Sequence, residues 1–367
     1  MLKKSIQFLP VIVQKAIFKA TYLLLSIFFH HYKDANKKDI FLFSTRRGGS
    51  TLLGQIISAN KGVRNIDQPL TLYSPPGIGG LLRAEIVEKF LPKNKYSQYA
   101  SVSPKEQDMI VNFIQLISDG ALSLSLWLEY KASRKKQFFF TDRVMLKFTD
   151  CNAIIDWMTE QFKVHVIYLI RHPVANAKSI MKNNWTITAS AYLDDEYFCK
   201  SYLTDEQVAF GRDILLSGDY FQQAILNWCL ENLVPLNFSS HKYLTLTYEE
   251  LVICPDEVIS LISDKFDLTD KKRMLEVSRI PSYSTTLSEN STIKNIVNEI
   301  KPGDKYKNII NRWHSKITDK EASQVTQILN VFGIDIYTCK SSIPKSQYLH
   351  YPSSFLGKIK SCKVDEK

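Results

Sequence analysis

The chain has 367 residues and a formal net charge of +10, with 45% hydrophobic and 23% charged residues. These values are ordinary for a globular protein of one large or two small α/β domains, and they exclude a chain that is disordered over most of its length. The positive charge suits an anionic ligand or membrane face. The Lys and Arg residues form no long basic arm, which argues against nucleic acid as a partner.

The first 38 residues predict a basic amphipathic helix. At about 100° per residue, the polar side carries Lys4, Gln7, Gln14, Lys15 and Lys19. The apolar side carries Ile6, Leu9, Val13, Ile17, Leu24 and Phe28. Such a helix suits the membrane interface, so we expect peripheral membrane contact through residues 1–30.

Two other interpretations of this segment are a helix packed on its own domain and a short signal anchor. Lys15 and Lys19 count against the anchor, because they interrupt the apolar run. We therefore expect a membrane-associated protein on the cytoplasmic face. A Golgi-type lumenal, signal-anchored protein is the alternative.

From residue 39 on, short apolar runs alternate with helical patterns. The predicted strands are Ile40–Ser44, Gln137–Phe148, Val164–Ile170 and Tyr243–Thr247. The predicted helices are 50–60, 104–132, 152–162, 173–183, 205–235, 255–266 and 319–332. The Gly- and Pro-rich residues 61–82 are predicted to form an irregular loop.

This alternation predicts an α/β fold, a P-loop-like three-layer sandwich with a central, mostly parallel sheet flanked by helices. We expect residues 39–340 to form this domain, with residues 341–367 as a C-terminal tail. In such sheets ligands bind at the carboxyl ends of the strands, where the strand order reverses. The six cysteines form no CxxC pair, and no other metal cluster is evident, so we expect no metal.

The first motif lies between a predicted strand and a predicted helix, and it reads STRRGGSTLL from Ser44 to Leu53. Its two glycines allow a tight turn, and the helix that follows offers free N–H groups and a positive dipole end. Hydroxyls and an arginine add further donors, so the loop suits a phosphate or a sulfate. The Lys-[Ser/Thr] pair of nucleoside triphosphatases is absent, which disfavours a triphosphate with magnesium.

The second motif follows the strongest predicted strand. Arg171 leaves the strand, Pro173 begins a helix, and Ser179 lies two turns further on. An arginine fork and a hydroxyl can hold a phosphate together. Taken alone, the pattern fits better an arginine that pairs with a surface carboxylate, with Ser179 as an ordinary surface residue.

Together the two motifs resemble the sulfotransferases that use 3′-phosphoadenosine-5′-phosphosulfate (PAPS), especially the carbohydrate and tyrosine branches. Their R-S-G-[ST]-[ST]-x-L loop is matched from Arg47 to Leu53, with Gly48 in place of Ser, and their R-x-P-x-x-x-x-x-S motif is matched from Arg171 to Ser179. The resemblance implies PAPS as co-substrate, with Arg171 and Ser179 at its 3′-phosphate. The predicted binding residues are Arg46, Arg47, Gly48, Gly49, Ser50, Thr51, Leu52, Arg171 and Ser179.

The same resemblance leaves the catalytic base open. Arg47 is suited to stabilise the leaving oxygen, but Gln68 stands where these branches carry a glutamate, and an amide accepts no proton at neutral pH. Asp67, His172 or His241 could serve as the base, or Gln68 could only orient the acceptor. Asp67 is our choice, although an aspartate before Pro69 can also simply cap a turn.

We therefore expect a sulfotransferase that moves a sulfuryl group from PAPS to a hydroxyl, with a glycan or a glycolipid as the acceptor. One alternative is a P-loop nucleotide kinase. Another is a catalytically impaired homologue that binds a nucleotide or a sulfoglycan, which the Gln68 substitution keeps open.

Overall fold

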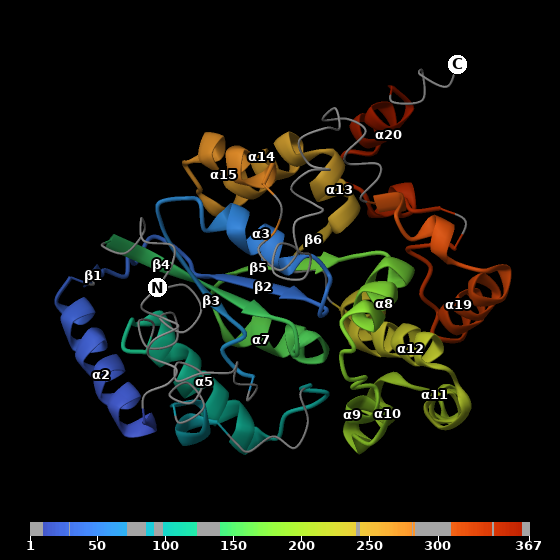
Figure 1. Cartoon of the computed structure of the whole chain (residues 1–367), viewed down its shortest axis with the longest axis horizontal. Coiled ribbons are helices and arrows are strands. Elements are labelled where there is room, and N and C mark those ends of the chain that lie inside the picture. Colours follow the sequence, from blue (N-terminus) through green and yellow to red (C-terminus); the bar gives the residue numbers. More distant parts are fainter. Residues whose placement is uncertain are drawn as a thin grey trace.

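The computed structural model describes residues 10–28, 30–71, 86–91, 98–122, 140–239, 243–280, 282, 310–339 and 341–361. The strands are β1 (His30–His31), β2 (Ile40–Ser44), β3 (Gly62–Asp67), β4 (Phe140–Phe148), β5 (His165–Ile170) and β6 (Leu244–Thr247). They pair in parallel in the order β3-β4-β2-β5-β6, and β1 pairs with the first residues of β4 (Figure 1).

Helices precede, connect and follow these strands. The longer ones are α2 (Val11–Phe28), α3 (Ser50–Ile57), α5 (Pro104–Ser118), α8 (Pro173–Lys182), α11 (Asp205–Ser217), α12 (Tyr220–Leu233), α14 (Pro255–Phe266), α15 (Lys271–Ser278), α19 (Asp319–Val331) and α20 (Pro352–Ser361). The shorter ones are α7 (Ile155–Gln161), α9 (Ser190–Leu193), α10 (Glu196–Tyr202) and α13 (Tyr248–Ile253). None of the helices in the described ranges is long and apolar enough to cross a bilayer.

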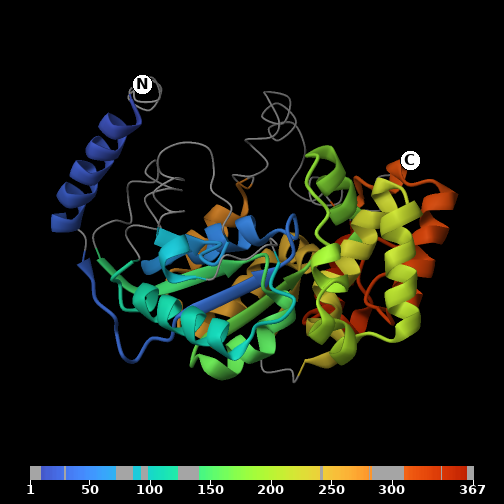
Figure 2. The same cartoon turned by 90° about the horizontal axis from the view of Figure 1, so that it is seen from below.

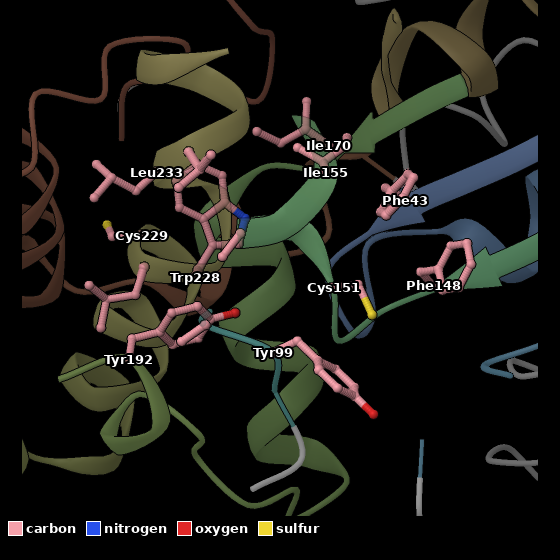
Figure 3. Packing of buried hydrophobic residues seen from close by; sticks show 14 of the residues in the cluster. Phe43, Tyr99, Phe148, Cys151, Ile155, Ile170, Tyr192, Trp228, Cys229 and Leu233 are labelled. Carbon is pink, nitrogen blue, oxygen red and sulfur yellow. The ribbon is translucent and has the colours of Figure 1, made fainter. Parts of the chain in front are cut away.

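The sheet separates two hydrophobic cores, which makes the fold three-layered as predicted. Ile40 and Leu42 of β2 pack with α3, α14 and α15 on one face, while Phe41 and Phe43 pack with α5, α7, α8, α12 and α19 on the other. The alternation follows from the two-residue period of a strand buried on both sides. Figure 3 shows Phe43 and Phe148 of neighbouring strands in the second core, with Trp228 of α12.

The strand order reverses between β2 and β5. The chain leaves β2 through α3 toward β3 and β4 on one side, and it leaves β5 through α8 toward β6 on the other. The two helices pack on opposite faces of the sheet. The carboxyl ends of β2 and β5 therefore flank the crevice in which such sheets bind ligands.

Three sequence predictions need correction. The predicted loop contains β3, which went unrecognised because Arg64 and Asn65 are polar and yet buried in this strand. The predicted helix 205–235 is two helices, since Asp219 caps a new helix after Gly218. The predicted helix 104–132 ends at Ser118, and its part from 123 on lies outside the described residues.

The C-terminal and N-terminal segments differ in how they contact the domain. Of the predicted tail, residues 341–361 pack on α13: Phe355 is fully buried, and the Tyr351 N–H donates to Glu250 at 2.7 Å. At the other end, α2 lies at the periphery of the molecule in both views (Figures 1 and 2).

Candidate active site

The phosphate loop joins the fully buried strand β2 to α3. Arg47 and Gly49 have positive φ values of 64° and 101°, so the chain turns sharply at both residues. Gly49 is the N-cap of α3 and makes no side-chain cap. The first N–H groups of α3 are therefore left to an anion at the carboxyl edge of the sheet.

Packing explains why position 48 is a glycine. A Cβ atom on Gly48 would collide with Ser44 Oγ and lie 2.9 Å from the Thr45 carbonyl oxygen. Ser44 Oγ is held in place because it donates to the Leu169 carbonyl at 2.7 Å. At Gly49 a Cβ atom would collide with the Tyr248 ring. A side chain at either glycine would thus displace the loop.

The two sequence motifs meet at the crevice between β2 and β5. Arg47 Nε donates to Ser179 Oγ on α8 at 2.9 Å, and Arg171 Nη1 donates to the Arg47 carbonyl at 3.1 Å. The Arg171 guanidinium lies 4.6 Å from the centre of the Tyr248 ring, and that of Arg47 lies 5.5 Å from the centre of the Trp185 ring. Two cations and a hydroxyl are therefore held together beside the loop.

Arg46 points into a buried polar network behind the loop. Its Nη2 donates to the Thr186 carbonyl at 2.9 Å and to Thr188 Oγ1 at 3.1 Å, and its Nε lies 3.8 Å from Glu231 Oε1. Asn227 connects Thr188 with Glu231. Burial raises the pKa of Glu231 to about 7, although Arg46 opposes that shift. The network fixes the backbone from which Arg47 projects.

The candidate base region lies at the carboxyl end of β3, with β4 between it and β2. Asp67 Oδ1 forms an ion pair with the Lys147 ammonium at 2.6 Å, and the Lys147 side chain is only 5% exposed. Gln68 has a positive φ of 50°, and its amide donates to Thr149 Oγ1. A carboxylate paired with a buried ammonium thus lies one residue before the Gln68 amide.

His172 cannot reach an acceptor in this structure. Its ring is fully buried and stacks on Trp313 with 4.2 Å between centroids. Nδ1 accepts the Val174 N–H at 3.2 Å, and Nε2 lies 3.2 Å from the Thr338 carbonyl. Burial lowers its pKa to about 3, so the ring is a neutral cap of α8. His241 lies outside the described residues.

The structure brings Arg47 of the loop into contact with Arg171 and Ser179, whereas the sequence patterns do not single out Lys147, Glu231 or Trp185. Lys147 could have been noticed, because it is the only charge in the otherwise apolar run from Val144 to Phe148. Glu231 and Trp185 carry no such signal. In the described part of the chain, no group of three or more His, Cys, Asp or Glu residues could hold a metal ion.

The family follows from a sequence comparison. A family model described as "Sulfotransferase domain" matches residues 37–331. The match covers most of the chain, so this protein belongs to the sulfotransferase domain family and is a sulfotransferase enzyme. No curated protein matches the chain.

Solved structures with related folds are distant. The sulfotransferase domain of the Synechococcus PCC 7002 olefin synthase is 18% identical with a TM-score of 0.41, covering 84% of this chain and 100% of that one. A domain from the curacin biosynthetic pathway is 17% identical with a TM-score of 0.39, covering 81% and 98%. Mouse sulfotransferase SULT7A1 complexed with PAP is 13% identical with a TM-score of 0.29, covering 81% and 90%. At these values the likenesses support no inference about activity.

Proposed function

We propose that this sulfotransferase uses PAPS and transfers its sulfuryl group to a hydroxyl of a glycan or a glycolipid. The observation that carries the donor assignment is the meeting of Arg47, Ser179 and Arg171 at the β2–β5 crevice. A nucleotide with phosphates at both its 3′ and 5′ positions needs two neighbouring anion sites. The loop with α3 offers one, and Arg171 with Ser179 offers the other.

The transfer is an in-line displacement at sulfur. The acceptor oxygen forms a bond to sulfur while the bond from sulfur to the bridging phosphate oxygen breaks, and that oxygen keeps the electron pair. Arg47 and the α3 N–H groups stabilise the charge on the leaving 3′,5′-adenosine bisphosphate. The base removes the acceptor proton, and Asp67 is our candidate for it.

Calorimetric titration of 3′,5′-adenosine bisphosphate tests the donor assignment. We expect tight binding to the wild type, weak binding of 5′-AMP, and weak binding of ATP with magnesium. Arg171→Ala and Arg47→Ala should each weaken bisphosphate binding by about 10- to 100-fold, because each removes a charge-assisted contact. If ATP with magnesium binds better than the bisphosphate, the assignment of PAPS to this site is wrong.

Arg212→Ala is the matched control for this titration. Arg212 on α11 also donates to a backbone carbonyl, that of Leu193, at 3.1 Å, but it lies outside the crevice. Its removal should leave bisphosphate affinity within about twofold, whereas an equal loss in all three variants would mean that the effect is only one of net charge.

We also propose that the acceptor is reached at a membrane, on its cytoplasmic face, and the exposed apolar side of α2 supports this. A lipid-linked sugar or glycolipid would then be presented beside the enzyme. Transfer of radiolabelled sulfate from PAPS to lipid-extractable glycans, compared with soluble sugars and tyrosine peptides, tests the acceptor class. Label that appears only in the peptides would contradict it.

A further inference from the structure

Helix α2 exposes apolar side chains in a way that no other described element does. Seven of the thirteen exposed large hydrophobic residues in the described ranges lie on α2. Ile12 is 82% exposed, and Leu23, Leu24 and Ile27 are 62% to 66% exposed. Single exposed hydrophobic residues are normal, but such a concentration marks a binding surface.

These side chains form one face, and that face is turned away from the domain. At about 100° per residue, the exposed hydrophobic residues of α2 fall within a sector of about 160° that contains no polar residue. We call this the outward apolar face; its main members are Ile12, Leu23, Leu24, Ile27 and Phe28. Tyr22 and Leu25, which are half-buried, point to the other side. The helix thus leaves its most apolar side exposed.

The charge around this face favours an anionic surface. The first 33 residues contain five lysines and no aspartate or glutamate. Lys19 is exposed and lies about 20° from Ile12 around the helix, so its stem can cover apolar surface while its ammonium reaches outward. At the C-terminal end of the helix, Lys33 pairs with Asp119 and Lys37 pairs with Asp142. These two lysines therefore add less to the attraction for an anionic surface.

We propose that the outward apolar face of α2 lies in the interface of a membrane that carries anionic headgroups, with the helix parallel to the membrane plane. A helix with a wide apolar sector, a basic border and no acidic residue has the chemistry of interfacial helices. A second copy of the chain fits less well, because a two-helix seam needs only a narrow apolar stripe. This inference deepens the membrane association proposed above and rests on it.

Vesicle flotation of the full chain tests the inference. The wild type should float with vesicles of phosphatidylcholine and phosphatidylglycerol, float less with phosphatidylcholine alone, and lose binding as salt is raised. The double variant Leu24→Asp/Ile27→Asp should lower the bound-to-free ratio by about tenfold or more, because two charges replace apolar side chains that enter the membrane interface. Leu216→Asp is the matched control, since Leu216 is 88% exposed on α11; it should float like the wild type.

Each other outcome counts against the proposal in a distinct way. Wild-type chain that stays with the soluble fraction overturns the membrane association itself. A double variant that floats like the wild type places the lipid contact elsewhere. A wild-type dimer in light scattering that the double variant abolishes, without flotation, identifies a second copy as the occupant. Titration with 3′,5′-adenosine bisphosphate separates these failures from failure of the proposed reaction, and normal affinity in the variant shows that it is folded.

Discussion

The two ends of the candidate active site are built in different ways. At the β2–β5 crevice, the donor groups come from two contiguous motifs and contact one another directly, as Arg47 does with Ser179. At the end of β3, Asp67 is held by Lys147 of the neighbouring strand, and Gln68 is held by Thr149. We call the crevice the nucleotide end and the end of β3 the base end, after the roles proposed for them above. The first matches the two sequence motifs, and the second carries Gln68 where the resemblance leads us to expect a glutamate.

This difference shows what each task demands. Binding phosphates requires several donors whose positions are fixed by a strand, a tight turn and a helix start, and such a unit is local in sequence. Accepting a proton requires one group at the right distance from the acceptor oxygen. Because this task needs only one group, a neighbouring residue can supply it, and Asp67 is the residue that we propose.

Asp67→Asn should give the largest effect on the reaction. We expect kcat to fall by about 100- to 1000-fold while the affinity for 3′,5′-adenosine bisphosphate stays unchanged, because the nucleotide end is untouched. Steady-state kinetics with calorimetry measures both quantities. Unchanged kcat would remove Asp67 from the mechanism, and the end of β3 could then no longer be called the base end.

Gln68→Glu is the matched variant for this test. If Asp67 is the base, a carboxylate at position 68 changes kcat by less than about threefold. A rise of tenfold or more would mean that the base end of the present chain is impaired. Since Asp67→Asn also leaves the buried Lys147 ammonium without its carboxylate, thermal unfolding of that variant must be compared with the wild type.

The strands, turn and helices that form the nucleotide end could be predicted from the sequence because their signals are local. Strand, glycine turn and helix start are adjacent from Ile40 to Ile57, and Pro173 marks the start of α8. The base end is harder to predict, because the pairing of Lys147 with Asp67 depends on β3 lying beside β4. The composition of residues 61–82 predicts a loop in place of β3. Burial of Glu231 behind Arg46 is likewise set by how α12 packs, which no local pattern encodes.

Glu231→Gln tests the nucleotide end, through the polar network behind Arg46. Burial raises the pKa of Glu231 from 4.5 to about 7, so the folded protein binds this proton more tightly than the unfolded chain. Its contribution to stability is full below pH 4.5 and is lost as pH rises through about 7. The shift corresponds to about 3 kcal/mol.

Urea unfolding at pH 5 and pH 8 measures this contribution. The free energy of unfolding of the wild type, relative to that of Glu231→Gln, should fall by up to about 3 kcal/mol between the two values. The difference between the proteins isolates Glu231 from other titrating groups, among them the nearby Asp150. An equal pH dependence in both would show that Glu231 stays ionised beside Arg46.

His172→Asn should have the smallest effect, and it tests whether the base end could have moved to this ring. Asn can still accept the Val174 N–H, as Nδ1 does now, so the cap of α8 survives while stacking on Trp313 is lost. We expect about 1 kcal/mol less stability, with kcat and its pH profile unchanged. A loss of kcat beyond about tenfold at normal bisphosphate affinity would instead make the imidazole part of the reaction. We expect no such loss, because the ring is buried and both of its nitrogens have polar partners. It holds the start of the helix that carries Ser179 and thereby supports the nucleotide end alone.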